Sequence, residues 1–176
     1  MIKYAITDPA IYSLEYLQNL ENSANWVLFR DKLTSNYKNN AKEFISQTKD
    51  YSYKKFIHQD YNLAKELKAD GVHLTSTQFS DIKKAKELGL FVIISTHSID
   101  EIIKAQNLGA NIVTYSPIFP TPNKGKPKGI KALKEAINSC DIKVIALGGI
   151  VTKEHIKEIE KTNAHGFASI RYFMSI

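Results

Sequence analysis

The segment TYSPIFPTPNKGKPKG, residues 114–129, carries the strongest indication of how this chain folds. A run of β-forming residues, 111–115, leads into it, and the prolines and glycines that follow break both strand and helix patterns. The resulting loop offers hydroxyl, amide and cationic side chains, which suit an anionic, phosphorylated small molecule. A second segment, VIALGGI at 144–150, is an apolar strand that ends at a pair of glycines. Together the two segments predict a phosphate-binding α/β barrel.

Short apolar runs alternate with amphipathic stretches along the whole chain, as expected for parallel strands joined by helices. Ser98 and Thr152 are the expected N-caps of two of the helices, and Ser98 forms a capping box with Glu101. Gly89 and Gly109 stand where two helices should end. The expected strands are 3–7, 26–30, 55–58, 71–74, 91–95, 111–115, 143–147 and 165–170. The expected helices are 13–21, 39–48, 61–67, 79–88, 99–108, 130–137 and 153–161.

Strict alternation in units of about 20 residues predicts a closed (β/α)₈ TIM barrel. A doubly wound open sheet is the alternative, but no glycine-rich dinucleotide fingerprint follows the first strand. Only six residues follow Ile170, so the last helix should be shortened or missing. No linker or shift in composition divides the chain, and residues 1–176 are expected to form a single domain.

Composition narrows the functional classes. At 43% hydrophobic and 24% charged residues, the 176-residue chain is typical of a soluble globular protein. The net charge is +6, but the lysines are scattered, which argues against a nucleic-acid-binding stripe. The longest apolar runs, such as 90–94, are far shorter than a membrane span, and no secretory signal opens the chain, so a cytoplasmic address is expected. The single cysteine, Cys140, excludes an internal disulfide and a cysteine-rich zinc site.

Functional side chains of such barrels gather at the carboxyl ends of the strands. Gly148 and Gly149 follow the seventh strand, where their N–H groups could form an anion nest, although a plain tight turn would also explain them. Arg30 and Lys32 close the second strand as a clamp for a charged group or, alternatively, as a surface ion-pair cluster.

The histidines are the candidates for proton transfer. His97 follows the fifth strand and could be an acid/base near neutral pH or a capping residue. His58 ends the third strand and could reach the barrel mouth, whereas His73 lies inside a strand and is interpreted as structural. Asp8 is interpreted as a turn residue, and no pair of carboxylates at strand ends makes an obvious metal site.

Six segments resemble the thiamine phosphate synthase family, which also contains the related thiazole tautomerases. They fall in the family's order and cover nearly the whole chain, and the proline-rich one is the most specific. The resemblance implies a (β/α)₈ barrel that binds a thiazole phosphate in thiamine biosynthesis. The segments are YAITD (4–8), FRDK (29–32), ADGVHL (69–74), STHS (95–98), SPIFPTP (116–122) and IALGGI (145–150).

The synthases join a pyrimidine diphosphate to the thiazole phosphate, a reaction that uses Mg²⁺ and cations to stabilise the leaving diphosphate. The resemblance implies diphosphate contacts at Arg30, Lys32, Ser95 and Lys124. It implies thiazole phosphate contacts at Thr121 and Gly149, with Ile170 as an apolar neighbour. Two matched positions carry unusual residues: Asn123 replaces a threonine, and Arg171 replaces a small serine and could contact the phosphate or fill the site.

The chain departs from the synthase pattern at the expected magnesium ligands. The Asn-Asp that follows the third strand in the synthases reads His58-Gln59 here, and the acidic segment after the fourth strand reads TSTQ at 75–78. A register shift to Asp60 could restore one ligand. Leu28 also replaces the glutamine that usually opens the second-strand motif. Neutral amides are poor ligands for a hard divalent cation.

Three hypotheses follow. The leading one is a thiazole tautomerase that needs no cofactor and uses His97 as acid/base, as the resemblance implies. The second is a Mg²⁺-dependent thiamine phosphate synthase that takes the thiazole phosphate and a pyrimidine diphosphate. The third is a silent binder of thiazole or thiamine phosphate, motivated by Arg171 and the short C-terminal end. That end could also leave apolar surface for a second copy of the chain.

Overall fold

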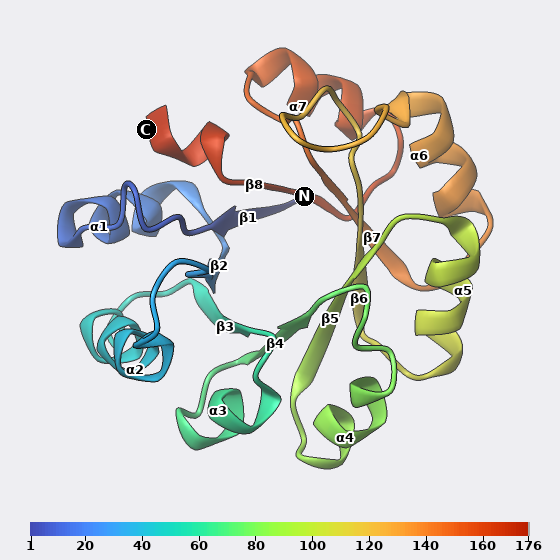
Figure 1. The fold of residues 1–176 in the computed structure, drawn as a ribbon. Helices are drawn as coiled ribbons and strands as arrows, with labels where there is room; N and C mark the ends of the chain where they lie inside the picture. The colour runs from blue at the N-terminus through green and yellow to red at the C-terminus, as the bar shows by residue number, and fades with distance from the viewer. Residues whose placement is uncertain (176) are drawn as a thin grey trace.

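The computed structural model describes residues 1–175 and confirms the barrel. Eight parallel strands are hydrogen-bonded in chain order, and β1 closes the ring by pairing with β8 through Ile2 and Gly166 (Figure 1). The strands are β1 (Ile2–Ile6), β2 (Trp26–Phe29), β3 (Lys54–His58), β4 (Gly71–Leu74), β5 (Phe91–Thr96), β6 (Ile112–Tyr115), β7 (Lys143–Leu147) and β8 (Gly166–Ser169). All lie within two residues of the predicted ranges.

Helices follow the first seven strands and form the outer ring (Figure 1). They are α1 (Leu14–Ser23), α2 (Tyr37–Gln47), α3 (Tyr61–Glu66), α4 (Asp81–Glu87), α5 (Ile99–Asn107), α6 (Gly129–Asn138) and α7 (Lys153–Glu160). Ser98 and Thr152 cap α5 and α7 through their side chains, as predicted. The capping box is not completed, because the Glu101 carboxylate accepts from the backbone N–H of His97 instead of that of Ser98.

The eighth helix is replaced by a short 3₁₀ helix, η1 (Arg171–Ser175). It lies in the arc between α7 and α1, where an eighth helix would complete the ring (Figure 1). Its Phe173 is 1% exposed and stacks on Phe167 of β8, with ring centroids 5.8 Å apart. Tyr172 also contacts Phe167, edge to face with ring centroids 5.4 Å apart. This short 3₁₀ helix with two aromatic residues therefore covers the barrel in place of the eighth helix, which was predicted to be shortened or missing.

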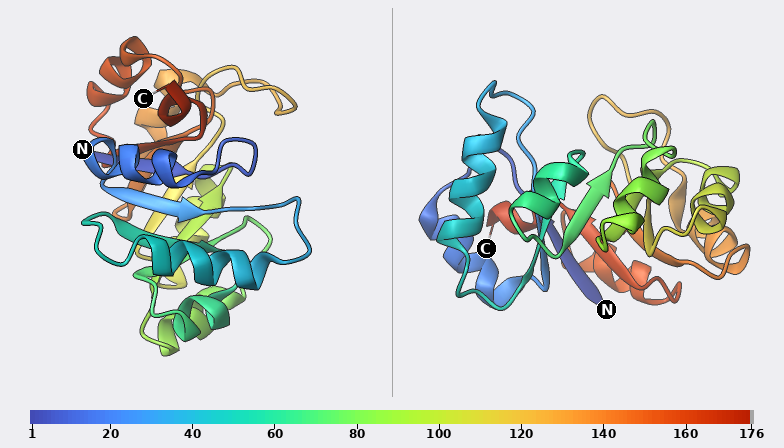
Figure 2. Two further views of the ribbon diagram at one scale, coloured as in Figure 1. Left: turned by 90° about the vertical axis from the view of Figure 1, so that its left-hand side faces the viewer. Right: turned by 90° about the horizontal axis from the view of Figure 1, so that it is seen from below.

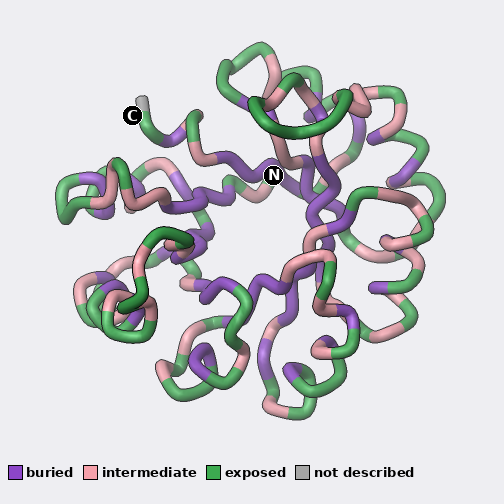
Figure 3. Tube along the Cα trace, in the orientation of Figure 1, coloured by how far each residue is buried: buried purple, intermediate pink, exposed green. Residues whose placement is uncertain are grey.

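Alternate strand residues point into the barrel or outward to the helices, which creates two apolar layers. The buried strands stand out from the exposed loops in Figure 3. The inner layer is rich in aromatic rings, and Tyr4, Trp26 and Phe56 contact one another with ring centroids 5.0–5.7 Å apart. These rings close the floor of the barrel, so a cavity can open only above them.

The loops after β2 and β6 rise on the side of the barrel opposite to the N-terminus (Figure 2). This side carries the carboxyl ends of the strands, where barrel sites form. Among the described helices, none is long and apolar enough to cross a membrane.

Candidate active site

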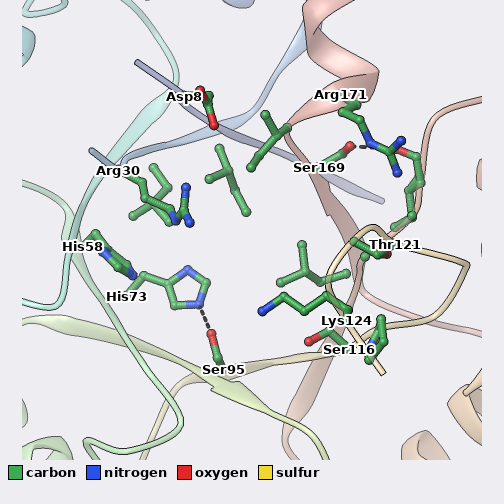
Figure 4. A pocket seen from close by; sticks show the side chains of 18 of the residues that line it. Asp8, Arg30, His58, His73, Ser95, Ser116, Thr121, Lys124, Ser169 and Arg171 are labelled. Carbon is green, nitrogen blue, oxygen red and sulfur yellow. Dashed lines mark hydrogen bonds between the residues drawn. The ribbon is translucent and has the colours of Figure 1, made fainter. Parts of the chain in front are cut away.

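A cavity of about 550 Å³ opens at the carboxyl ends of the strands. Residues from the ends of all eight strands line it, from Ile6 and Asp8 after β1 to Ser169 and Ile170 at the end of β8. Figure 4 shows cationic and imidazole side chains converging on it from opposite walls. Its volume is in the range of small-molecule sites in proteins.

The structure brings together the residues singled out from the sequence, with one exception. Asn123 does not line the cavity, because it sits in the turn of the β6–α6 loop with a φ of 57° and an exposed side chain. Those that line the cavity are Arg30, Lys32, His58, Ser95, His97, Thr121, Lys124, Gly148, Gly149, Ile170 and Arg171. Their assigned roles stay predictions.

The backbone conformation after β7 requires glycine at both positions of the pair. Gly148 and Gly149 have φ values of 96° and 71°, a region that side chains disfavour. A Cβ on Gly149 would lie 2.5 Å from the carbonyl oxygen of Phe119, and one on Gly148 would lie 2.8 Å from Cα of Pro117. The β6–α6 loop therefore packs directly on this turn, with Phe119 N–H donating to Gly148 O at 3.0 Å. Only glycine permits this close approach.

The end of β8 is held against the same turn. The buried Ser169 hydroxyl donates to Ile150 O at 2.7 Å and accepts from Tyr172 N–H at 3.1 Å. Arg171 follows as an exposed residue on the cavity wall. Its guanidinium therefore extends from the rim and does not fill the pocket, which leaves it available to an anion bound at the glycine pair. We call Thr121, Gly148, Gly149, Ile170 and Arg171 the glycine end of the cavity.

The opposite wall carries Arg30 and Lys32. Lys124 extends into the cavity from the β6–α6 loop, next to Thr121, and its charge acts on Lys32 (Figure 4). We call Arg30, Lys32 and the Lys124 ammonium the cationic end. Arg30 is positioned by Thr7, whose hydroxyl accepts from Arg30 N–H at 2.9 Å and donates to Arg30 O at 3.2 Å. Burial lowers the pKa of Lys32, and the neighbouring Arg30 and Lys124 lower it further. None of the ion pairs found among residues 1–175 includes these three cations. An uncompensated group of like charges attracts an anion.

Two histidines near the cationic end are held neutral. Burial, followed by the charges of Arg30 and Lys32, lowers the pKa of His58 to about 4. Burial is also the main cause that lowers the pKa of His73 to about 3. The structural interpretation of His73 was incomplete, since this buried residue also reaches the cavity and lies 3.0 Å from the Ser95 hydroxyl.

His97 differs from them because it is exposed and sits over the β5–β6 edge. Its Nδ1 lies 3.2 Å from Ser116 Oγ and 3.3 Å from Ser116 O. The carbonyl can only accept from Nδ1, whereas the hydroxyl can donate to it or accept from it, and together the two contacts orient the imidazole ring. Its backbone N–H donates to Glu101, which fixes the residue at the start of α5. Ser116 lies in the loop segment that the sequence singles out, but its contact with His97 could not be predicted, because it depends on the pairing of β5 with β6.

The donor set does not fit a divalent metal ion. Among the described residues, no group of three or more His, Cys, Asp or Glu side chains could hold one. Asp60 does not line the cavity, and its Oδ1 accepts from Leu63 N–H at 2.8 Å as the cap of α3, so it does not stand in for the missing ligand in this arrangement. Asp8 is the carboxylate that lines the cavity, and Gln78 is bonded to Thr75. A hard cation such as Mg²⁺ needs several oxygen ligands, preferably carboxylates.

A closed (β/α)₈ barrel with a cavity at the carboxyl ends of its strands, lined partly by charged side chains, is the arrangement found in TIM-barrel enzymes. The family model for thiamine monophosphate synthase matches residues 3–173. This chain therefore belongs to the thiamine monophosphate synthase family, which comprises enzymes of thiamine biosynthesis, and the resemblance noted in the sequence is confirmed.

Individual relatives agree with this membership. A putative thiamine-phosphate synthase 2 of Aquifex aeolicus is 36% identical over an alignment that covers 97% of this chain and 96% of that protein. The thiamine-phosphate synthase of Pyrococcus horikoshii is 32% identical over 97% of this chain and 86% of that protein. The solved structure of thiamine phosphate pyrophosphorylase from Pyrococcus furiosus has a TM-score of 0.87 at 28% identity, covering 99% of this chain and 88% of that one.

Proposed function

We propose that this protein binds a phosphorylated, carboxylated thiazole and moves a proton on its ring without a metal ion. The observation that carries this proposal is a cavity with a glycine turn at one end and uncompensated cations at the other, and, among residues 1–175, no carboxylate cluster between them. A substrate with a phosphate at one end and a carboxylate at the other matches this charge pattern. A diphosphate leaving group stabilised by Mg²⁺ does not, because its metal would lack ligands.

Each wall has a role in this reaction. The phosphate binds at the glycine end, where the Arg171 guanidinium can donate to its oxygens. The Thr121 hydroxyl, which donates to Phe119 O at 3.0 Å without ligand, can donate to the phosphate after it rotates away from that carbonyl. The carboxylate binds at the cationic end, to Arg30 and Lys32. His97 accepts a proton from one ring position through Nε2, and the same group returns a proton at another position. Only bonds to hydrogen break and form, so the product is an isomer of the substrate and the histidine is regenerated.

Mg²⁺-dependent synthesis of thiamine phosphate is the second candidate, favoured by the names of the relatives. In that reaction the cationic end would hold the pyrimidine diphosphate, as the resemblance implies. The chemistry of the donor set opposes it, since His58 and Gln59 stand where the synthases carry Asn and the Asp magnesium ligand.

The two candidates are separated by assaying both reactions with the same preparation. We expect isomerisation of the carboxylated thiazole phosphate in the presence of EDTA, and no thiamine phosphate from the coupling substrates with Mg²⁺. Magnesium-dependent release of diphosphate would overturn the proposal. Binding of the thiazole phosphate with neither reaction would identify a silent binder.

His97→Gln tests the acid/base role, because glutamine keeps a similar size but cannot transfer protons near pH 7. We expect kcat for isomerisation to fall at least about 100-fold, while the affinity for thiazole phosphate changes less than about threefold. His165→Gln is the matched control, since His165 is exposed at the opposite end of the barrel, where its carbonyl accepts from Ile2 N–H. An equal loss of binding and turnover would contradict the role of His97.

A further inference from the structure

A buried chain of hydrogen bonds links Tyr4, His73 and Ser95 beneath the cavity. Tyr4 Oη lies 3.0 Å from His73 Nδ1, and His73 Nε2 lies 3.0 Å from Ser95 Oγ, the bond dashed in Figure 4. Tyr4 is 0% exposed and His73 is 2% exposed, whereas Ser95 is half-buried and lines the cavity. The three residues come from β1, β4 and β5, and the proton transfer proposed above uses none of them.

The surroundings of Tyr4 determine which groups donate and which accept along these hydrogen bonds. Its ring packs against Trp26 and Phe56 and stacks on His73 in the barrel interior. Burial raises the pKa of Tyr4 well above its usual value, so the phenol keeps its proton. The described residues offer its hydroxyl one hydrogen-bond partner, His73 Nδ1. If Nδ1 carried a hydrogen, the phenol proton would be left unpaired in the core, which is unfavourable. Tyr4 therefore donates to Nδ1.

At His73 the same order of donor and acceptor continues from one ring nitrogen to the other. Burial keeps this imidazole neutral near pH 7, and the nearby His58 and Arg30 act in the same sense. A neutral imidazole has one N–H group, and since Nδ1 accepts, Nε2 must carry the hydrogen. Nε2 then donates to Ser95 Oγ, so the hydroxyl hydrogen of Ser95 cannot point at His73.

We propose that Tyr4 and His73 are positioning residues that hold the Ser95 hydroxyl as a hydrogen-bond donor into the cavity. Its hydrogen then points to an anionic oxygen of the ligand, in the cavity that also carries Arg30 and Lys124 (Figure 4). The opposite direction would turn oxygen lone pairs toward an anion. This inference rests on the proposed function only because it requires an anionic ligand. It holds both for isomerisation and for thiamine phosphate synthesis.

The first test reads the tautomer directly. We expect nitrogen-15 imidazole spectra of the full chain at pH 7 to show His73 as the neutral Nε2–H form, its signals assigned by their loss in His73→Gln. Tyr4→Phe should move population to the Nδ1–H form. Tyr53→Phe is the matched control, since its buried hydroxyl has no hydrogen-bond partner among the described residues and Tyr53 precedes β3 at the far end of the barrel. An Nδ1–H or imidazolium form in the unmodified protein would overturn the proposal.

The second test measures binding of inorganic diphosphate by calorimetry. We expect Ser95→Ala to weaken binding about tenfold, the typical effect of one hydrogen bond to a charged group. Tyr4→Phe should weaken binding about threefold, and the double variant should bind no more weakly than Ser95→Ala alone, because Tyr4 acts through Ser95. Additive losses would overturn the positioning role. If Tyr4→Phe does not fold, the spectrum of the unmodified protein decides the direction. Neither readout uses turnover, so both stand apart from the outcome of the isomerisation assay.

Discussion

The two ends of the cavity are built by different means. The glycine end depends on the backbone, with Gly148 and Gly149 at positive φ and the β6–α6 loop packed on them. The cationic end depends on side chains of Arg30, Lys32 and Lys124, supported by neutral histidines. A site made of backbone tolerates almost no substitution, whereas side chains can be exchanged without disturbing the barrel. The departures from the synthase pattern are all in side chains. His58 and Gln59 depart near the cationic end and Arg171 departs at the glycine end, whereas the glycine pair itself is kept.

The strongest test of this difference is Gly149→Ala. Its Cβ would collide with the backbone of Phe119, so we expect a loss of about 3 kcal/mol in the free energy of unfolding, together with lost affinity for thiazole phosphate. Gly89→Ala is the matched control, because Gly89 has a φ of 77° but open space around its Cβ position, and should cost only about 1 kcal/mol. Urea unfolding and calorimetry measure both quantities. Similar costs for the two variants would show that the loop does not pack tightly on the turn.

The histidines of the cationic end should make the fold sensitive to acid. Since the pKa of His58 is lowered to about 4 and that of His73 to about 3, the unfolded chain binds more protons than the folded one below about pH 6.5. Stability should therefore fall as the pH drops from about 6.5 toward 4, by up to about 1.4 kcal/mol per pH unit for each histidine.

Urea unfolding at pH 7 and pH 5 measures this loss. His58→Gln should reduce it by removing one of the two groups. The same substitution at the exposed His165 is the control. Partial burial and the charge of Lys143 also lower the pKa of His165, but it is much less buried than His58, so its removal should reduce the loss by less. A stability that does not change between the two pH values would contradict the neutral state of both histidines.

The cationic end should distinguish ligands that carry a carboxylate in addition to the phosphate from ligands that carry the phosphate alone. We expect Arg30→Met to weaken binding of the carboxylated thiazole phosphate about tenfold, or about 1.4 kcal/mol, because it removes a charge-assisted hydrogen bond. The thiazole phosphate without the carboxylate should bind almost unchanged. Lys38→Met is the surface control, since Lys38 pairs with Glu66 on the helical exterior. Equal weakening of both ligands would place the phosphate, and not the carboxylate, beside Arg30.

The smallest expected effect concerns Gln59, which stands where the synthases carry an acid. Its φ is 67°, a conformation that asparagine and aspartate tolerate better than glutamine. Gln59→Asn should therefore raise the free energy of unfolding by about 0.5 kcal/mol. Gln18→Asn, in the exposed face of α1, should lower it by a few tenths, because asparagine is the poorer helix former. A destabilised Gln59→Asn would mean that the side chain makes contacts that outweigh the backbone strain.

Most of the fold could be read from the sequence, because its determinants are local. Apolar runs, N-caps such as Ser98 and Thr152, and the glycines that end α4 and α5 each depend on neighbours a few residues away. The site followed from one further rule, that parallel strands bring their carboxyl ends to the same face. Side-chain direction could not be predicted in this way. Asn123, expected at the site, turns outward in its loop, and the possibility left open for Asp60 was decided by its place as the cap of α3.

The sequence by itself determined the alternation of strands and helices, the barrel and the position of the glycine pair. The spacing of apolar residues and the conformational freedom of glycine are local properties, so they can be recognised within a few residues. Only the tertiary structure decided which polar groups meet. Tyr4 and Ser95 are far apart in the chain, and His73 joins them only because the barrel closes with this register. The same holds for His97 and Ser116 across β5 and β6. Hydrogen bonds between distant strands depend on strand register and the direction of each side chain, which no local pattern encodes.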